Sequence, residues 1–239
     1  MCCSEINLQN LPQNLTSQEM CNPYIVIRTF FSQYHLPLAV RQLNKWVTAA
    51  FAQKSRLGKS DTLALLDLGD QLVRLLEAAQ MLNDDTNFQE KALDLTNADD
   101  ATLLNTALYY TPHRAARAWE CFPRHLSISE YGNPYLVFDK CLGHLSLSGW
   151  RRFIKDLFHA ATYDMQIYTV TQDDDLRKTY RCLFELLEAC HLIKVREIDP
   201  DRSSPVVPVP SPPIPTLTPD QRHEIDEHLE NAAYFFHSE

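Results

Sequence analysis

The strongest constraint on the fold is a repeat: residues 15–82 resemble the segment that begins 111 positions further along the chain. Sixteen of these 68 positions hold the same residue in both segments, whereas unrelated segments would share roughly four. A tandem duplication explains this agreement, so the sequence predicts two copies of one structural unit. The polar and turn-forming matches that mark the repeat best are Asn22, Pro23, Tyr24 and Glu77, with their images Asn133, Pro134, Tyr135 and Glu188.

The repeated polar residues have the pattern of helix starts. Residues 16–19 and 127–130 each hold Thr or Ser followed three places later by Glu, which fits a capping box. In the Asn-Pro-Tyr triplets that follow, Asn can cap a free amide group, and Pro needs no hydrogen-bond partner in the first turn. Each triplet therefore predicts the start of a helix, over residues 23–34 in the first copy and 134–145 in the second.

The remaining segments of the repeat also read as helices. Apolar residues recur at steps of three and four, most clearly from Leu65 to Leu82, which is the pattern of a helix that buries one face. The chain has only 5 Gly residues, fewer than sheet-rich folds use at their turns. We therefore predict an all-α fold of two bundles with about four helices each, packed with pseudo-twofold symmetry. The further helices expected are 37–55, 60–82, 96–110 with an extension to 121, 149–163 and 173–193.

The repeat also divides the chain. We predict an N-terminal tail at residues 1–10, a first unit at 11–121 and a second unit at 122–239. Residues 199–216 are rich in proline, so we expect an extended spacer before the last helix of the second unit. That helix is predicted to begin near Thr218.

Comparison of the two copies is a test for a catalytic or metal site, because the residues of a site in the ancestral unit are expected in both copies. None of the seven cysteines meets another cysteine at the 111-residue offset, and the histidines fail likewise. His223 and His228 are five residues apart, which places them about 140° from each other around a helix, whereas zinc binding on a helix uses two histidines four apart on one face. Asp173–Asp175 fits a helix start, where the dipole favours acidic residues. We therefore predict no cofactor, no metal and no catalytic residue.

Basic residues near aromatic ones suggest a second kind of partner. Residues 112–125 and 150–155 both have this composition, which can bind nucleic acid phosphates. Residues 1–196, however, hold 20 basic and 22 acidic side chains, so the chain has no basic balance before its acidic end. The cations that we expect on an interaction surface are Arg41, Arg114, Arg117, Arg151, Arg152 and Lys155.

Two charged positions are identical in both copies although they lie off the apolar stripes. Arg41 and Glu77 recur as Arg152 and Glu188. Our hypothesis is an Arg–carboxylate pair in each unit that links the second helix to the third. A symmetric binding surface formed by the two arginines and a coincidence are the alternatives.

These observations favour a non-catalytic, cytosolic interaction or scaffold protein whose partner is another protein. The first twenty residues lack the pattern of a secretory signal, and no run reaches the roughly 18 apolar residues that cross a bilayer. A nucleic-acid-binding regulator that uses the two basic stretches is the alternative, and an enzyme with a site between the copies comes third.

Overall fold

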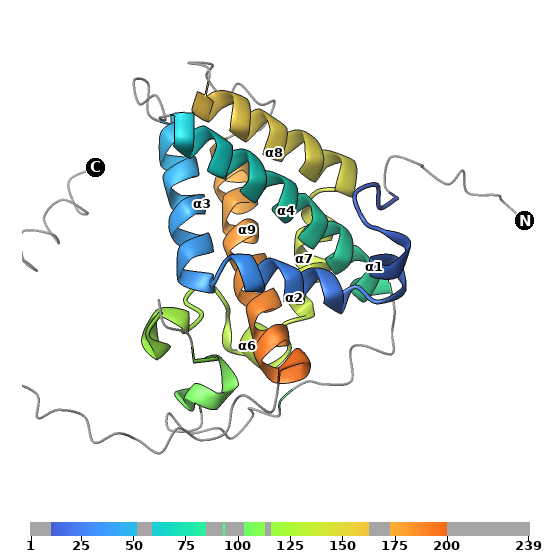
Figure 1. The fold of residues 1–239 in the computed structure, drawn as a ribbon, viewed down its shortest axis with the longest axis vertical. Helices are drawn as coiled ribbons and strands as arrows, with labels where there is room; N and C mark the ends of the chain where they lie inside the picture. The colour runs from blue at the N-terminus through green and yellow to red at the C-terminus, as the bar shows by residue number, and fades with distance from the viewer. Residues whose placement is uncertain are drawn as a thin grey trace, which may run out of the picture. The chain divides into compact units, whose positions relative to one another are not determined.

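The protein is all-α in the part of the chain that its computed structural model describes, which is residues 11–51, 59–84, 93, 103–112, 116–162 and 173–199. Eight α-helices form there, and no strand does (Figure 1). They are α1 (Ser17–Cys21), α2 (Tyr24–Gln33), α3 (Leu36–Phe51), α4 (Lys59–Asp84), α6 (Ile128–Gly132), α7 (Leu136–His144), α8 (Leu147–Thr162) and α9 (Asp173–Ile193). None of these helices is long and apolar enough to cross a membrane.

The two short helices begin as predicted. Thr16 caps α1 and Ser127 caps α6, and in both cases the Glu three residues later accepts a hydrogen bond from the capping residue's amide, at 2.9 Å and 2.8 Å. Both capping boxes are therefore confirmed. Each one satisfies amide groups that a helix start leaves without a partner.

The Asn-Pro-Tyr triplets lie between two helices rather than at the first residue of one. Asn22 ends α1 and Asn133 ends α6, and α2 and α7 begin two and three residues later. The Asn133 side chain accepts a hydrogen bond from the Tyr135 amide at 3.2 Å, so it helps to start α7. The triplets precede these helices as predicted, but each helix begins one or two residues later than expected. The predicted capping by Asn with Pro in the first turn is wrong, because Pro23 and Tyr135 are the N-cap residues and neither makes a side-chain capping hydrogen bond.

Helices α2, α3, α4, α7, α8 and α9 share one hydrophobic core, whereas Tyr131 of α6 belongs to a second, smaller cluster that includes Tyr109 and Leu192 of α9. Helix α8 packs against both α3 and α4, and α9 packs against α3 and α7 (Figure 1). Trp46 of α3 and Trp150 of α8 are fully buried in this core, together with apolar residues from α2, α4, α7 and α9. Burial on one face of each helix supplies the main stabilisation, about 25 cal/mol for each Å² of apolar surface removed from water.

The connecting segment before α6 differs from the prediction. Leu103 is helical, but the helix does not continue to Tyr110: a short 3-10 turn follows at Thr106–Leu108, and a second one spans Ala118–Cys121. Side chains of α9 and of the π-helical turn that follows it, Lys194–Ile198, bond to the carbonyl groups of this segment. His191 Nε2 lies 2.9 Å from the Tyr109 oxygen, and Arg196 Nε donates to the Leu108 oxygen at 2.8 Å.

Several predictions lie outside the described residues. These are the tail at 1–10, the start of the predicted fourth helix at 96–102, the proline-rich spacer and the last helix near Thr218. The described residues all belong to one compact unit, Met1–Ser204.

Candidate interaction site beside Glu188

Glu77 is a completely buried carboxylate at the centre of a hydrogen-bond network. Its Oε2 accepts a hydrogen bond from the Asn14 amide at 2.8 Å, and its Oε1 accepts one from Asn14 Nδ2 at 2.9 Å. Arg151 of α8 adds two more, from Nε at 3.1 Å and from Nη2 at 2.7 Å. Glu77 of α4 therefore ties both the segment before α1 and helix α8 to α4.

Glu188 of α9 makes a similar network with one member missing. Its oxygens accept hydrogen bonds from the amides of Arg124 and His125 at 3.0 Å and 2.8 Å, and His125 Nδ1 lies 2.7 Å from Oε1. In both networks, the residue 63 positions before the carboxylate, Asn14 or His125, contacts it through its amide and its side chain. No arginine side chain among the described residues bonds to Glu188, and Val40 stands 111 positions before Arg151.

A cavity of about 470 Å³ lies beside Glu188, and we call it the Glu188 cavity. Its wall includes Leu36, Val40 and Arg41 of α3, and Phe122, His125 and Glu188 on the opposite side. Glu188 is only 3% exposed and forms part of the cavity wall.

An exposed aromatic side chain lies near this cavity. Arg124 lines the cavity, and its guanidinium carbon lies 4.2 Å from the centre of the Trp119 ring. The Trp119 side chain is 65% exposed, which is unusual for so large an apolar group. The Glu188 cavity is therefore bordered by a cation stacked on an indole.

The predicted Arg41–Glu77 and Arg152–Glu188 pairs are wrong. The cation at Glu77 is Arg151, the neighbour of Arg152 on α8, whereas the donors at Glu188 come from the segment before α6. The reason is that Glu77 faces α8 of the other half of the chain rather than α3 of its own half.

The predicted cationic surface is not continuous. Arg152 and Lys155 are exposed on α8, but Arg151 between α8 and α4 turns inward to Glu77. Arg41 lines the Glu188 cavity and Arg117 is exposed at the start of the second 3-10 turn. Arg114 lies outside the described residues. The sequence did not indicate the roles of His125 and Val40. His125 bonds to Glu188, and Val40 stands where the other half of the chain has Arg151, and both facts follow only from the contacts in the fold.

A second cavity, of about 340 Å³, lies between α2, the connecting segment and the end of α9. Arg28, His35, His191 and Lys194 contribute its polar groups. Burial lowers the pKa of His191 to about 4, so this imidazole is neutral at physiological pH. Lys194 pairs with Asp199 at 3.2 Å, which leaves Arg28 as the more available cation.

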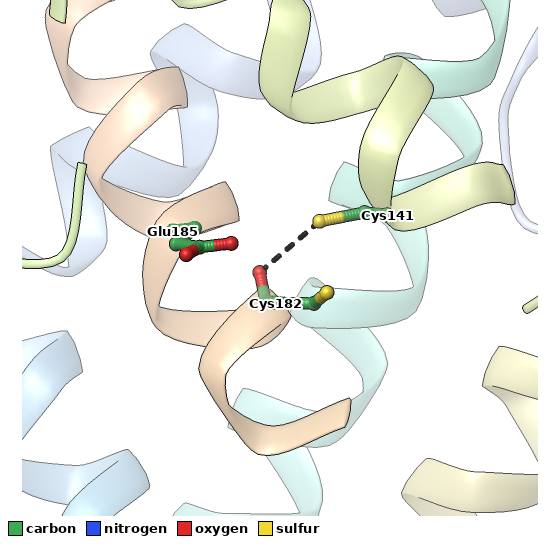
Figure 2. Close-up of side chains that lie close together, drawn as sticks. All are labelled: Cys141, Cys182 and Glu185. Carbon is green, nitrogen blue, oxygen red and sulfur yellow. Dashed lines mark hydrogen bonds between the residues drawn. The ribbon is translucent and has the colours of Figure 1, made fainter. Parts of the chain in front are cut away.

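Three buried side chains could in principle hold a metal ion. The Sγ atoms of Cys141 and Cys182 and a carboxylate oxygen of Glu185 all lie within 4.8 Å of one another (Figure 2). The Cys141 thiol instead donates a hydrogen bond to the Cys182 carbonyl at 3.4 Å. The neighbouring Cys182 side chain and burial both raise the pKa of the Cys141 thiol. Figure 2 shows that the Cys182 sulfur points away from Glu185.

The Glu185 carboxylate already has two cationic partners. Arg181 Nε donates to its Oε1 at 2.8 Å, and Lys140 Nζ lies 2.7 Å from its Oε2. A metal ion would have to displace at least one of them. Burial of this carboxylate is therefore explained by its ion pairs, and the two thiols fill space as small apolar groups.

The two tyrosines of the repeated triplets meet each other. The Tyr24 and Tyr135 hydroxyl oxygens lie 2.7 Å apart, and both donate to Glu197 Oε2, at 3.2 Å and 2.8 Å. This contact joins the starts of α2 and α7 to the end of the described chain.

No protein-family model, curated protein or solved structure matches this chain.

Proposed function

We propose that the fold arose by tandem duplication of one helical unit, with the two copies related by an approximate twofold axis. The helix bounds support this proposal: α1 and α6 begin and end 111 residues apart, and so do α3 and α8. The contact between the Tyr24 and Tyr135 hydroxyls supports the axis, because equivalent residues of two copies touch each other where they approach a twofold axis. Superposition of residues 15–82 on 126–193, with the same helices in the same order, is the direct check.

We further propose that the protein is a non-catalytic, cytosolic interaction protein that binds another protein through the surface at the Glu188 cavity. The observation that carries this proposal is the exposed Trp119 ring beside the cavity, stacked on Arg124. Tryptophan and arginine are the residues most enriched among the side chains that dominate protein interfaces. A partner that covers this indole would remove a large apolar surface from water.

The contacts of Arg151 favour a protein partner over the nucleic-acid alternative. Its guanidinium group is held by Glu77, so the stretch at 150–155 offers Arg152 and Lys155 to phosphates instead of three cations. Each cation that contacts a phosphate contributes to affinity and to its dependence on salt. A nucleic-acid complex formed through this stretch is therefore expected to be weak.

Capture of partners from a nuclease-treated extract tests the proposal, with the full chain as bait. We expect Trp119→Ala to reduce the recovery of the partner about tenfold or more, because truncation of a central interface Trp commonly costs 2 kcal/mol or more. Leu63→Ala is the matched control, since Leu63 of α4 is 61% exposed and lies on another element. Equal loss in both variants, or a complex that disappears with nuclease treatment, would reject the proposed surface.

A further inference from the structure

The two buried carboxylates differ in how many hydrogen bonds they accept. An ionised carboxylate has about four acceptor positions. Glu77 uses four, two of them for the Arg151 guanidinium group. Glu188 accepts three. The difference lies at Oε1, which accepts three hydrogen bonds at Glu77 and two at Glu188, whereas each Oε2 accepts one, from a backbone amide. Glu188 therefore has room for one more donor.

The Glu188 cavity occupies the place where that donor is expected. At Glu77, the extra donors come from a side chain on α8, and the corresponding position on α3 holds Val40. Val40 lines the cavity, as does Glu188. The short valine side chain leaves unfilled the space that an arginine side chain takes up at the other carboxylate.

The other walls suit a flat cation with an apolar stem. Leu36 and Val40 offer apolar surface, and Phe122 offers an aromatic ring, on which a guanidinium group can stack. Glu120 adds a second carboxylate to the lining. Arg41 and Arg124 oppose a cation, but Arg41 is exposed to solvent and Arg124 lies over Trp119. Water screens an exposed charge of this kind.

We infer that the Glu188 cavity binds an arginine side chain of the partner protein, in the way that Glu77 binds Arg151. This inference rests on the proposed function, since it names the group that the partner presents. A guanidinium group would donate to the free position of Glu188 through a charge-assisted hydrogen bond, while its methylene stem contacts Val40 and Leu36. Specificity for arginine over lysine would follow from the planar fork and from stacking on Phe122.

Titration of the full chain with methylguanidinium, followed by amide NMR shifts, tests the inference without knowledge of the partner. We expect saturable shifts at the amides of Arg124 and His125, both of which donate to Glu188. Glu188→Gln is expected to weaken binding about tenfold or more, because it removes the charge from the acceptor. Methylammonium is expected to bind more weakly than methylguanidinium, and acetate should leave these amides unchanged.

Filling the cavity from within gives a second test that does not remove a buried group. In Val40→Arg, the new side chain is expected to reach Glu188 as Arg151 reaches Glu77, and so to abolish the methylguanidinium shifts. Val47→Arg is the matched control, because Val47 is another partly buried residue of α3 that packs against the core but does not line the cavity. Far-UV circular dichroism verifies that both variants fold.

Three results would overturn the inference: no saturable shifts in the unmodified chain, the same shifts in Val40→Arg, or equal shifts from acetate. Its failure is distinguishable from failure of the proposed function. Partner capture that depends on Trp119, without any binding of methylguanidinium, would reject the arginine site and leave the interaction surface in place. Methylguanidinium binding without a Trp119-dependent partner would reject the proposed interaction surface at Trp119 and leave the arginine site in place.

Discussion

The Arg151–Glu77 pair makes a quantitative prediction about stability. The carboxylate of Glu77 is completely buried and the Arg151 side chain is 18% exposed, so solvent screens their attraction only slightly. Removal of one partner from a buried ion pair costs about 3–5 kcal/mol, because the other charge is left without compensation. Asn14 still donates two hydrogen bonds to Glu77, which places Arg151→Met at the low end of this range, near 3 kcal/mol.

A double-mutant cycle separates the interaction between Arg151 and Glu77 from the other effects of each substitution. We expect Arg151→Met and Glu77→Gln to show a coupling energy of about 2 kcal/mol, the value for a hydrogen bond to a charged group. Urea unfolding followed by circular dichroism gives the free energies of unfolding. In a thermal melt, a loss of 3 kcal/mol corresponds to a fall in Tm of about 6–12 °C for a chain of this size.

The same cycle with Arg41→Met in place of Arg151→Met is the control. Arg41 is exposed at the Glu188 cavity, so its effect and that of Glu77→Gln are expected to add within about 0.5 kcal/mol. Additive losses in the Arg151 cycle, or a coupling above about 1 kcal/mol in the Arg41 cycle, would refute the assignment of Arg151 as the partner of Glu77.

Three further predictions concern a histidine, the thiols and two glycines. Because burial lowers the pKa of His191 to about 4, the unfolded chain takes up a proton below about pH 6.5 that the folded chain does not. Stability is therefore expected to fall by about 3 kcal/mol as the pH drops from 6.5 to 4, and His191→Asn should flatten this part of a urea-derived stability profile. Among the five described cysteines, only Cys21 is exposed, so a disulfide reagent followed by peptide mapping should modify Cys21 within minutes and the four buried thiols only in urea. Rapid native labelling of the buried thiols would contradict the packing around them. Gly143→Ala is expected to raise the free energy of unfolding by about 0.5 kcal/mol, and Tm with it, because a Cβ there meets no atom within 4 Å and Ala favours a helix. Gly69→Ala should lower Tm instead, since its Cβ would lie 3.0 Å from the buried Trp46 ring.

Features that depend on a few neighbouring residues could be predicted from the sequence. The capping boxes at Thr16 and Ser127 are local, because the residues that make the hydrogen bonds are three positions apart. The apolar stripe of α4 is equally local, and the helix indeed spans Lys59–Asp84 around it. These signals gave the all-α class and the positions of most helices.

Features that depend on how helices lie against each other could not be predicted. The partner of Glu77 comes from α8, 74 positions away, and nothing near either residue indicates that α4 and α8 pack together. The connecting segment shows the same limit. Its carbonyl groups at Leu108 and Tyr109 bond to Arg196, in the π-helical turn after α9, and to His191 of α9, both more than 80 positions later, where the sequence favours a longer helix.

If the two halves are copies, the residues that differ between them show how a duplicated core diverges. Buried Phe30 and Ala39 of the first half correspond to buried Cys141 and Trp150 of the second, so a large and a small side chain exchange places. The Trp150 indole donates to the Cys141 carbonyl at 3.1 Å, so the larger side chain lies against the position that became smaller. The loss of volume at one position partly offsets the gain at the other, and cores tolerate compensating changes better than single ones.

Charged residues that differ between the halves are compensated at Glu130 but not in the same way at Glu188. In the first half, Arg74 pairs with Glu19; in the second, Glu185 replaces that arginine and Lys140 bridges Glu130 and Glu185, at 2.9 Å and 2.7 Å. The charge lost at one position is thus restored at another. At the position equivalent to Arg151, Val40 brings no cation to Glu188, whose partners among the described residues are the Arg124 and His125 amides and the His125 imidazole, and a cavity lies beside them. If the two halves are copies, the exchange of Arg151 for Val40 therefore differs from that of Arg74 for Glu185: Lys140 supplies a cation at Glu130, whereas the described side chain at Glu188 is the His125 imidazole.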